Sequence, residues 1–189
     1  MIYNLTRLRQ AYTAGEKHTF LLFWGHTPSR DGRIGKSCFS QWWNSPFEVE
    51  GVRYSCTEQY MMAEKARLFK DNEVMKAILK SSNPKEMKAL GRAVRNFNSD
   101  VWDRQCYEIV KRGNLAKFSQ NPSLRDYLIS TRRAILVEAS PYDRIWGIGM
   151  GEADPNANNP MKWKGSNLLG FALTEIRDQL LLASEVESI

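Results

Sequence analysis

Apolar and polar residues follow two different periods along this chain, and each period predicts a kind of element. Short apolar runs over 19–24 and 134–138 are typical of buried strands. Apolar residues on both sides of Glu50-Gly51 predict a hairpin, whose turn requires the permissive backbone of Gly. The strands that the sequence predicts are therefore few and short.

A period near 3.6 residues predicts helices along most of the remaining chain. We expect helices over 57–69, 72–79, 99–118 and 124–129, from Asn83-Pro84 onward and from Ser166 onward. Thr57 and Ser99 are candidate caps, and Asn83-Pro84 combines a cap with a proline at the first helical position. The stretch 140–160 is rich in Gly, Asn, Asp and Pro, and Trp146 and Ile148 within it favour an ordered, packed loop.

Length and composition indicate one globular domain. The chain has 189 residues, of which 42% are hydrophobic and 25% charged, close to globular averages. We expect an N-terminal extension over 1–18, a catalytic domain over 19–183 and a C-terminal tail over 184–189.

Cysteine content and charge limit the class of protein further. Three widely spaced cysteines predict reduced, mostly buried thiols, and neither a disulfide framework nor a zinc site. Neither a signal peptide nor a membrane span stands out, which favours a soluble protein of the cytoplasm, with the nucleus as an alternative. The net charge of +6 would suit an anionic partner, but on net charge alone a merely solvated surface is the favoured interpretation. We expect no metal, no cofactor and no membrane partner, and no protein partner can be inferred.

The predicted helix over 57–69 carries the clearest candidate chemistry. Helical spacing places Glu58 and Lys65 on one stripe with Met61, Met62 and Phe69. A lysine on an apolar face that points inward is desolvated, which lowers the pKa of its amine and prepares it as a nucleophile. Alternatively, Lys65 extends to solvent and Glu58 only favours the positive end of the helix dipole.

A second candidate region runs from 141 to 151 and combines Asp143 and Trp146 with three alternating glycines. Glycines such as Gly147 let backbone approach a ligand closely, and the face of a Trp can stack on a base. The glycine spacing does not match the dinucleotide-binding pattern. A tight surface turn anchored by a core Trp is the structural alternative. Arg92 belongs to a basic middle third that could contact phosphates, or that forms the solvated face of helices.

Many short segments together resemble the NADAR family, also called YbiA-like, over roughly residues 20 to 181. These segments are Phe23 to His26, Phe39 to Trp42, Pro46 to Gly51, Thr57 to Lys65, Leu90 to Arg92, Trp102-Asp103, Lys117-Phe118, Leu136 to Ser140, Asp143 to Gly149 and Asn167 to Gly170. Their order and spacing make the resemblance far more specific than any one of them.

The resemblance implies an α+β fold, a single mostly helical domain with a few short strands, and an enzyme that hydrolyses N-glycosidic bonds. Two substrate classes are associated with the family: ADP-ribose on guanine bases of DNA or RNA, and phosphoribosylaminopyrimidine intermediates of riboflavin synthesis. Our preferred hypothesis is that the protein removes ADP-ribose from guanine. The alternative is cleavage of the riboflavin intermediates, and a third hypothesis is a non-catalytic module that binds ADP-ribose or a nucleotide.

The resemblance also assigns roles to residues. Lys65 matches the lysine expected to form a Schiff base with the opened ribose, and Glu58 or Asp143 would assist departure of the base. Trp102 and Trp146 are candidates to stack the base. Asn167 at the start of the last helix, with nearby backbone N–H groups, could hold phosphate or ribose hydroxyls. Arg92 and Gly147 complete the expected substrate contacts.

The sequence departs from the family pattern at three places, where it reads Ser40-Gln41-Trp42, Thr57-Glu58-Gln59 and Gly165-Ser166-Asn167. None of the departures removes Lys65 or Glu58. Gln41, Gln59 and Ser166 are therefore expected to line the pocket and to influence substrate choice.

Overall fold

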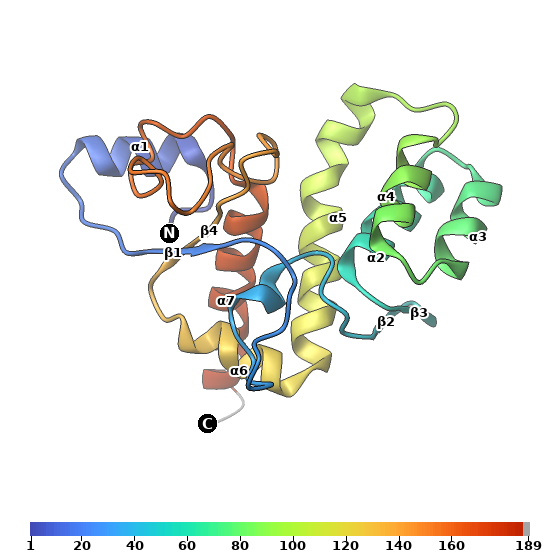
Figure 1. Ribbon diagram of the computed structural model, residues 1–189, viewed down its shortest axis with the longest axis horizontal. Helices are drawn as coiled ribbons and strands as arrows, with labels where there is room; N and C mark the ends of the chain where they lie inside the picture. The colour runs from blue at the N-terminus through green and yellow to red at the C-terminus, as the bar shows by residue number, and fades with distance from the viewer. Residues whose placement is uncertain (187–189) are drawn as a thin grey trace. The chain divides into compact units, whose positions relative to one another are not determined.

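The computed structural model describes residues 1–186 and separates the chain into two compact units. The first unit combines Met1–Ser40 with Ser123–Ile189, and the second is Gln41–Pro122. Seven helices and a few short strands in the described residues confirm the predicted α+β, mostly helical class (Figure 1). Because the first unit is made of two separate segments, the division was not visible in the predicted order of elements.

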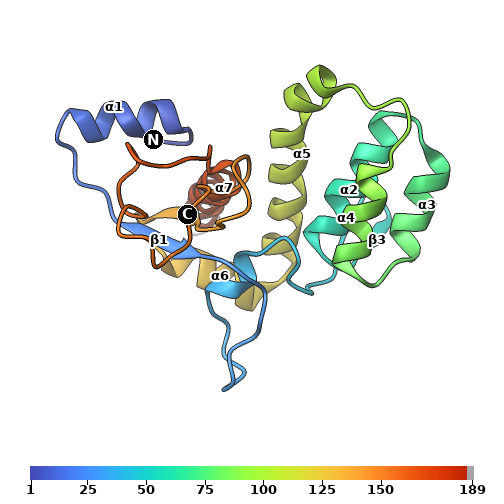
Figure 2. The ribbon, with the colours of Figure 1, turned by 45° about the horizontal axis from the view of Figure 1, so that its top comes forward.

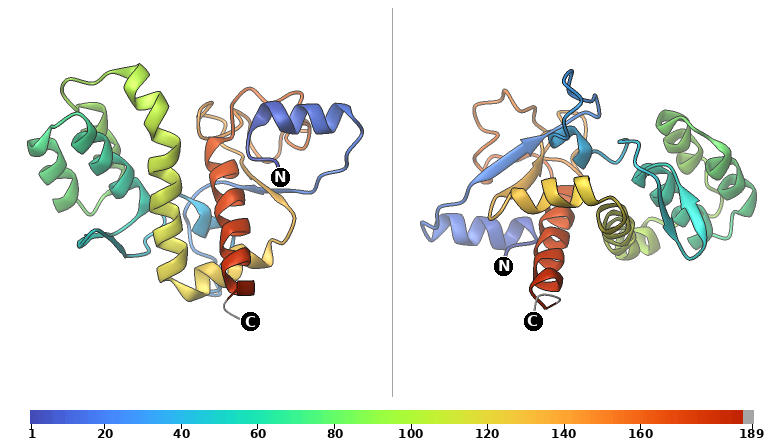
Figure 3. Two further views of the ribbon diagram at one scale, coloured as in Figure 1. Left: turned by 180° about the vertical axis from the view of Figure 1, so that it is seen from behind. Right: turned by 90° about the horizontal axis from the view of Figure 1, so that it is seen from below.

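A two-stranded parallel sheet forms the centre of the first unit. The elements of this unit are α1 (Leu5–Thr13), β1 (Phe20–Phe23), the 3-10 helix η1 (Lys36–Phe39), α6 (Pro122–Ser130), β4 (Ile135–Glu138) and α7 (Leu168–Val186). β1 pairs with β4 from Phe20 opposite Ile135 to Phe23 opposite Glu138. α7 packs against β4 (Figure 3). Both predicted strands and the predicted docking of the last helix are confirmed.

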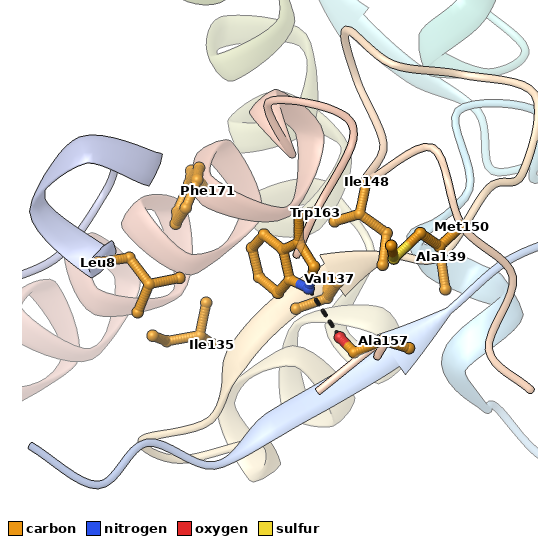
Figure 4. Close-up of a cluster of buried hydrophobic side chains, with 9 residues drawn as sticks. All are labelled: Leu8, Ile135, Val137, Ala139, Ile148, Met150, Ala157, Trp163 and Phe171. Atoms are coloured by element: carbon orange, nitrogen blue, oxygen red, sulfur yellow. Dashed lines mark hydrogen bonds between the residues drawn. The ribbon is translucent and has the colours of Figure 1, made fainter. Parts of the chain in front are cut away.

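Apolar side chains from α1, the sheet, the long loop and α7 share one core (Figure 4). Its members are Leu8, Ile135, Val137, Ala139, Ile148, Met150, Ala157, Trp163 and Phe171. The Trp163 indole N–H donates to the Ala157 carbonyl at 2.8 Å, which fixes the loop from inside. The stretch 140–160 is thus an ordered, packed loop, as expected.

The N-terminal segment contributes to this core. α1 was not predicted, because Arg7 and Arg9 interrupt a weak apolar pattern. Leu8 is nevertheless fully buried, and the Arg9 guanidinium donates to the carbonyls of Pro160 and Trp163 at 3.0 and 3.1 Å. We expected residues 1–18 as an extension, and part of that segment packs into the first unit. Of the expected tail over 184–189, residues 187–189 lie outside the described part of the chain.

The second unit surrounds a central helix with three others and a hairpin (Figure 2). Its elements are β2 (Phe47–Val49), β3 (Val52–Tyr54), α2 (Thr57–Leu68), α3 (Asn72–Lys80), α4 (Pro84–Arg92) and α5 (Ser99–Gln120). The hairpin turn has positive φ at both central residues, 52° at Glu50 and 76° at Gly51, as a type I′ turn requires. The predicted hairpin and helices are confirmed, and α5 runs two residues beyond the expected end at 118.

Two predicted caps are displaced by one residue. Cys56, not Thr57, precedes α2, and Thr57 is its first helical residue. Asn98 caps α5 by accepting from the Val101 N–H, so Ser99 is already helical. Local sequence alone fixes a helix start only to within one or two residues. The Asn83 cap followed by Pro84 is confirmed.

The three cysteines are buried thiols, as expected. No helix within residues 1–186 combines the length and apolar character needed to cross a bilayer.

Gly170→Ala is expected to destabilise the first unit. A Cβ at Gly170 would lie 2.1 Å from the Leu136 carbonyl oxygen, so α7 would have to move away from β4. Overpacking of this kind costs about 1–3 kcal/mol, and a backbone atom cannot yield as a side chain can. Thermal unfolding should show a Tm lower by several degrees, whereas Gly35→Ala, which meets no atom within 4 Å, should change it little. Equal Tm values for the two variants would contradict this packing.

Candidate active site

The helix that carries the two principal candidates is buried on almost every side. Residues from Thr57 to Glu64 and Ala66 are all buried, because α3, α4 and α5 each pack against α2. Lys65 is only half-buried, so its side chain lies where the burial of α2 ends. The predicted apolar stripe therefore faces protein, and the lysine lies at its edge.

Aromatic rings surround the Lys65 amine. Its Nζ lies 4.2 Å from the centre of the Phe97 ring and 5.6 Å from that of the Trp102 ring. Phe97 packs edge-on against Phe69, with the ring centres 5.2 Å apart. Within residues 1–186, no carboxylate forms an ion pair with Lys65. Lys65 therefore lacks the carboxylate partner that a structural ammonium group usually has.

Burial lowers the pKa of the Lys65 amine, and the nearby charge of Arg92 lowers it further. Both effects disfavour the ammonium form, since one removes water from it and the other repels it. The aromatic faces act in the opposite direction by attracting a cation. The resulting lowered pKa increases the fraction of neutral amine, which is the form able to attack carbon.

A hydrogen-bonded network holds α2 against α5, on which Trp102 lies. The Arg112 guanidinium donates to the Tyr60 hydroxyl at 2.5 Å and to the Glu64 carboxylate at 2.8 Å. Burial raises the pKa of Tyr60 to about 12, so the phenol stays protonated. This network fixes the two helices that bring Lys65 and Trp102 together.

Glu58 lies at the first turn of α2 and is 5% exposed. Its backbone N–H donates to the Gln41 carbonyl at 2.9 Å, and the Thr57 hydroxyl donates to the same oxygen at 3.2 Å. Gln41 also accepts, through its side-chain oxygen, from the buried Asn114 amide at 2.8 Å. Glu58 precedes Lys65 by seven positions, which corresponds to about 10.5 Å along the helix axis.

Gln59 has a structural role instead of the expected place in a pocket. Its side-chain oxygen accepts from the Ser55 N–H at 2.7 Å, and its amide donates to carbonyls at the end of α3, including that of Ile78 at 3.0 Å. All of its polar groups are thus used to connect the β3–α2 junction with α3. The expectation that Gln59 lines the pocket is wrong for this reason.

Asp143 organises a tight turn in the first unit. Its Oδ1 accepts from the N–H groups of Ile145 and Trp146 at 2.9 and 2.8 Å. A Cβ on Gly147 would lie 2.8 Å from the Glu138 carbonyl oxygen, so the glycine is required by the protein's own backbone. The structure thus gives this glycine a packing role, and its contact with substrate stays a prediction.

Asn167 and the start of α7 also serve the fold. The Asn167 side chain is fully buried, accepting from the Glu138 N–H at 2.9 Å and donating to the Leu136 carbonyl at 3.0 Å. The N–H groups of Asn167 and Leu168 donate to the carbonyls of Gly147 and Ile145. The expected phosphate donors are therefore already occupied, because the turn after Asp143 caps α7.

The predicted site residues divide between the two units. Lys65, Glu58, Trp102, Gln41 and Arg92 lie in the second unit, where Lys65, Trp102 and Arg92 come together around one amine. Those of the first unit are Asp143, Trp146, Gly147 and Asn167. That site residues of both units act on one substrate stays a prediction.

Sequence reasoning missed Phe97 and Asn114. Phe97 lies between helices, where no periodic pattern assigns it a face. Asn114 could have been found, since it is an amide on the buried face of a predicted helix. In the part of the chain that the structure describes, no three His, Cys, Asp or Glu side chains gather as metal ligands would.

Arg92→Ala should shift the pH dependence of turnover to higher pH. Removal of the positive charge raises the pKa of Lys65, so less amine is neutral at pH 7. We expect a loss in kcat/KM at pH 7 of less than about tenfold, with recovery at alkaline pH. A kcat/KM profile against pH measures this, with Arg92→Lys as the control that keeps the charge. A shift to lower pH would contradict the assigned effect of Arg92.

Comparisons with known proteins place this chain in a family. The NADAR domain model matches residues 22–181, and the chain belongs to the NADAR family. N-glycosidase R617 of Acanthamoeba polyphaga mimivirus is 43% identical over 170 residues, covering 87% of this chain and 98% of the relative. N-glycosidase YbiA of Escherichia coli is 31% identical over 146 residues, covering 77% and 81%. These names designate hydrolases acting on N-glycosyl bonds, the enzyme class predicted for this chain.

A solved structure supports the fold. The NMR structure of the E. coli protein YbiA matches with a TM-score of 0.70 and 27% identity, covering 89% of this chain and 88% of that one. The resemblance predicted from the sequence is therefore confirmed.

Proposed function

We propose that this chain hydrolyses the bond between ribose and guanine in ADP-ribosylated nucleic acid, with Lys65 as the nucleophile. The observation that carries the proposal is the Lys65 amine, half-buried between two aromatic rings, without a carboxylate partner in the described residues and with a lowered pKa. Membership of a family with members named N-glycosidases supports the reaction class.

The reaction proceeds in two stages. The Lys65 nitrogen bonds to C1 of the ribose while the bond from C1 to the base breaks, and an acid gives a proton to the departing base. The nitrogen then loses a proton, and the C1–O4 bond opens to give an imine. Water adds to C1 and the lysine departs, so that the net change is addition of one water to release free base and free sugar.

Glu58 is the acid that we favour. It lies on the same helix as Lys65 and in the same unit, about two helical turns away. Its carboxyl group is shielded from bulk water, since the side chain is 5% exposed. Asp143 is the alternative, although its Oδ1 is already occupied by two backbone N–H groups.

Substrate choice is supported by charge and by the ring faces. The net charge of +6 suits a substrate that carries a pyrophosphate and a nucleic-acid strand. Trp102 provides a face on which a purine can stack beside the reacting carbon.

Two parallel assays test this proposal. One measures release of ADP-ribose from an oligonucleotide with ADP-ribosylated guanine, and the other measures release of ribose phosphate from the phosphoribosylaminopyrimidine. We expect turnover of the first. Activity only on the phosphoribosylaminopyrimidine would identify the riboflavin intermediates as the substrate of the same reaction. Tight binding of ADP-ribose without turnover of either substrate would indicate a binding module.

A further inference from the structure

Two large aromatic side chains are exposed together at one end of the parallel sheet. Trp24 follows β1 directly, and Tyr142 lies four residues beyond the end of β4. Trp24 is 53% exposed and Tyr142 is 86% exposed, and their ring centres are 6.1 Å apart. Since strands β1 and β4 are parallel, both residues lie at the carboxyl ends of the strands.

The fold does not require these exposed rings. A large aromatic side chain usually buries most of its surface, and adjacent exposed ones mark a binding surface. Ile145, in the same turn as Tyr142, is also 61% exposed. The turn itself is held by the Asp143 hydrogen bonds, so Tyr142 projects from a fixed backbone.

Two cationic side chains lie in the same region of the first unit. The stems of Arg144 and Lys164 both lie against Gly149, where a Cβ would come within 3.0 Å of Arg144 Cγ and 3.1 Å of Lys164 Cβ. Both residues are exposed, and neither forms an ion pair with any described residue. Glu152 of the same loop is paired with Lys36. Arg144 and Lys164 thus place two positive charges in the part of the first unit that includes the Tyr142 turn, together with the carboxylate of Asp143.

We propose that Trp24, Tyr142, Arg144 and Lys164 form a platform for single-stranded nucleic acid, in which bases stack on the rings and phosphates contact the two cations. Stacking on aromatic faces with flanking cations is the usual way to hold a single strand without reading its sequence. The platform extends the proposed function, on which it rests for its role, by giving the protein a second contact with the strand that carries the modified guanine.

Fluorescence anisotropy with an unmodified, guanine-containing single-stranded DNA oligonucleotide tests the platform without requiring turnover. The variant Trp24→Ala/Tyr142→Ala should bind at least about tenfold more weakly, because each stacked base contributes enough for that change. Trp24→Phe should retain binding, because it keeps a ring. Tyr12→Ala, which removes an exposed ring on α1, is the matched control and should bind like wild type.

The salt dependence of binding tests the cations. Arg144→Ala/Lys164→Ala should reduce the slope of log K against log salt by about 1.4, since each lost phosphate contact on a single strand removes about 0.7. Arg30→Ala, in the exposed loop after β1, should leave the slope unchanged. An unchanged slope in the double variant, or binding that is indifferent to loss of both rings, would overturn the platform.

Comparison of two substrates separates this inference from the proposed function. The ratio of kcat/KM for modified oligonucleotide to kcat/KM for the modified nucleoside should fall about tenfold in Trp24→Ala/Tyr142→Ala. Oligonucleotide binding that depends on the rings, without any release of ADP-ribose, would support the platform and refute the proposed function. Release of ADP-ribose with an unchanged ratio would support the proposed function and overturn the platform.

Discussion

Lys65→Ala should lower kcat for N-glycosidic cleavage by at least about a thousandfold, because loss of a covalent nucleophile removes the whole reaction path. The side chain forms no ion pair with any described residue, so the change should leave the fold intact. Lys65→Arg keeps a charge of similar reach but offers no neutral amine, so it should be equally inactive. Single-turnover rates with a modified oligonucleotide measure the effect.

Lys76→Ala is the matched control for this variant. It removes an exposed lysine from α3 in the same unit and should keep wild-type turnover. A Lys65→Ala enzyme with more than about a tenth of wild-type kcat would remove the amine from the mechanism, because that amine is assigned a bond to the sugar.

Glu58→Gln should lower kcat by about a hundredfold or more, because an amide cannot give the departing base a proton. The substitution keeps the shape of a side chain that is 5% exposed, so packing changes little. The loss should shrink for a substrate whose leaving group needs no protonation. Comparison of kcat for a guanine and for such an activated leaving group measures it.

Asp143→Asn is the companion variant that decides between the two acids. Asn can still accept from the Ile145 and Trp146 N–H groups, so the turn should survive. If Glu58 is the acid, Asp143→Asn should retain most of the turnover. A large loss in Asp143→Asn with activity retained in Glu58→Gln would reassign the role to Asp143.

Local pattern predicted most elements of this fold for a clear reason. Each helix carries its own apolar stripe and start signal, as in Asn83-Pro84, and such signals act over a few residues. α1 was missed because two arginines interrupt its stripe. The division into two units was also missed, since it depends on pairing between β1 and β4, more than a hundred residues apart.

In the candidate site, too, local patterns predicted less than the contacts between residues distant in sequence determine. Helical spacing placed Lys65 on an apolar stripe and left open whether the side chain faces protein or solvent, and the structure shows it half-buried beside two aromatic rings. Spacing could not predict that Phe97 contacts the Lys65 amine, because Phe97 lies in the connection between α4 and α5. Nor could it predict that the side-chain amides of Gln59 and Asn167 donate to backbone carbonyls distant in sequence, because those partners are set by tertiary packing.

Borohydride trapping of the wild-type chain with ADP-ribosylated guanine oligonucleotide tests the central claim most directly. Reduction converts an imine into a stable secondary amine, which intact mass and peptide mapping can locate. We expect one sugar adduct on Lys65. Turnover without an adduct, or an adduct on a different lysine, would contradict the mechanism.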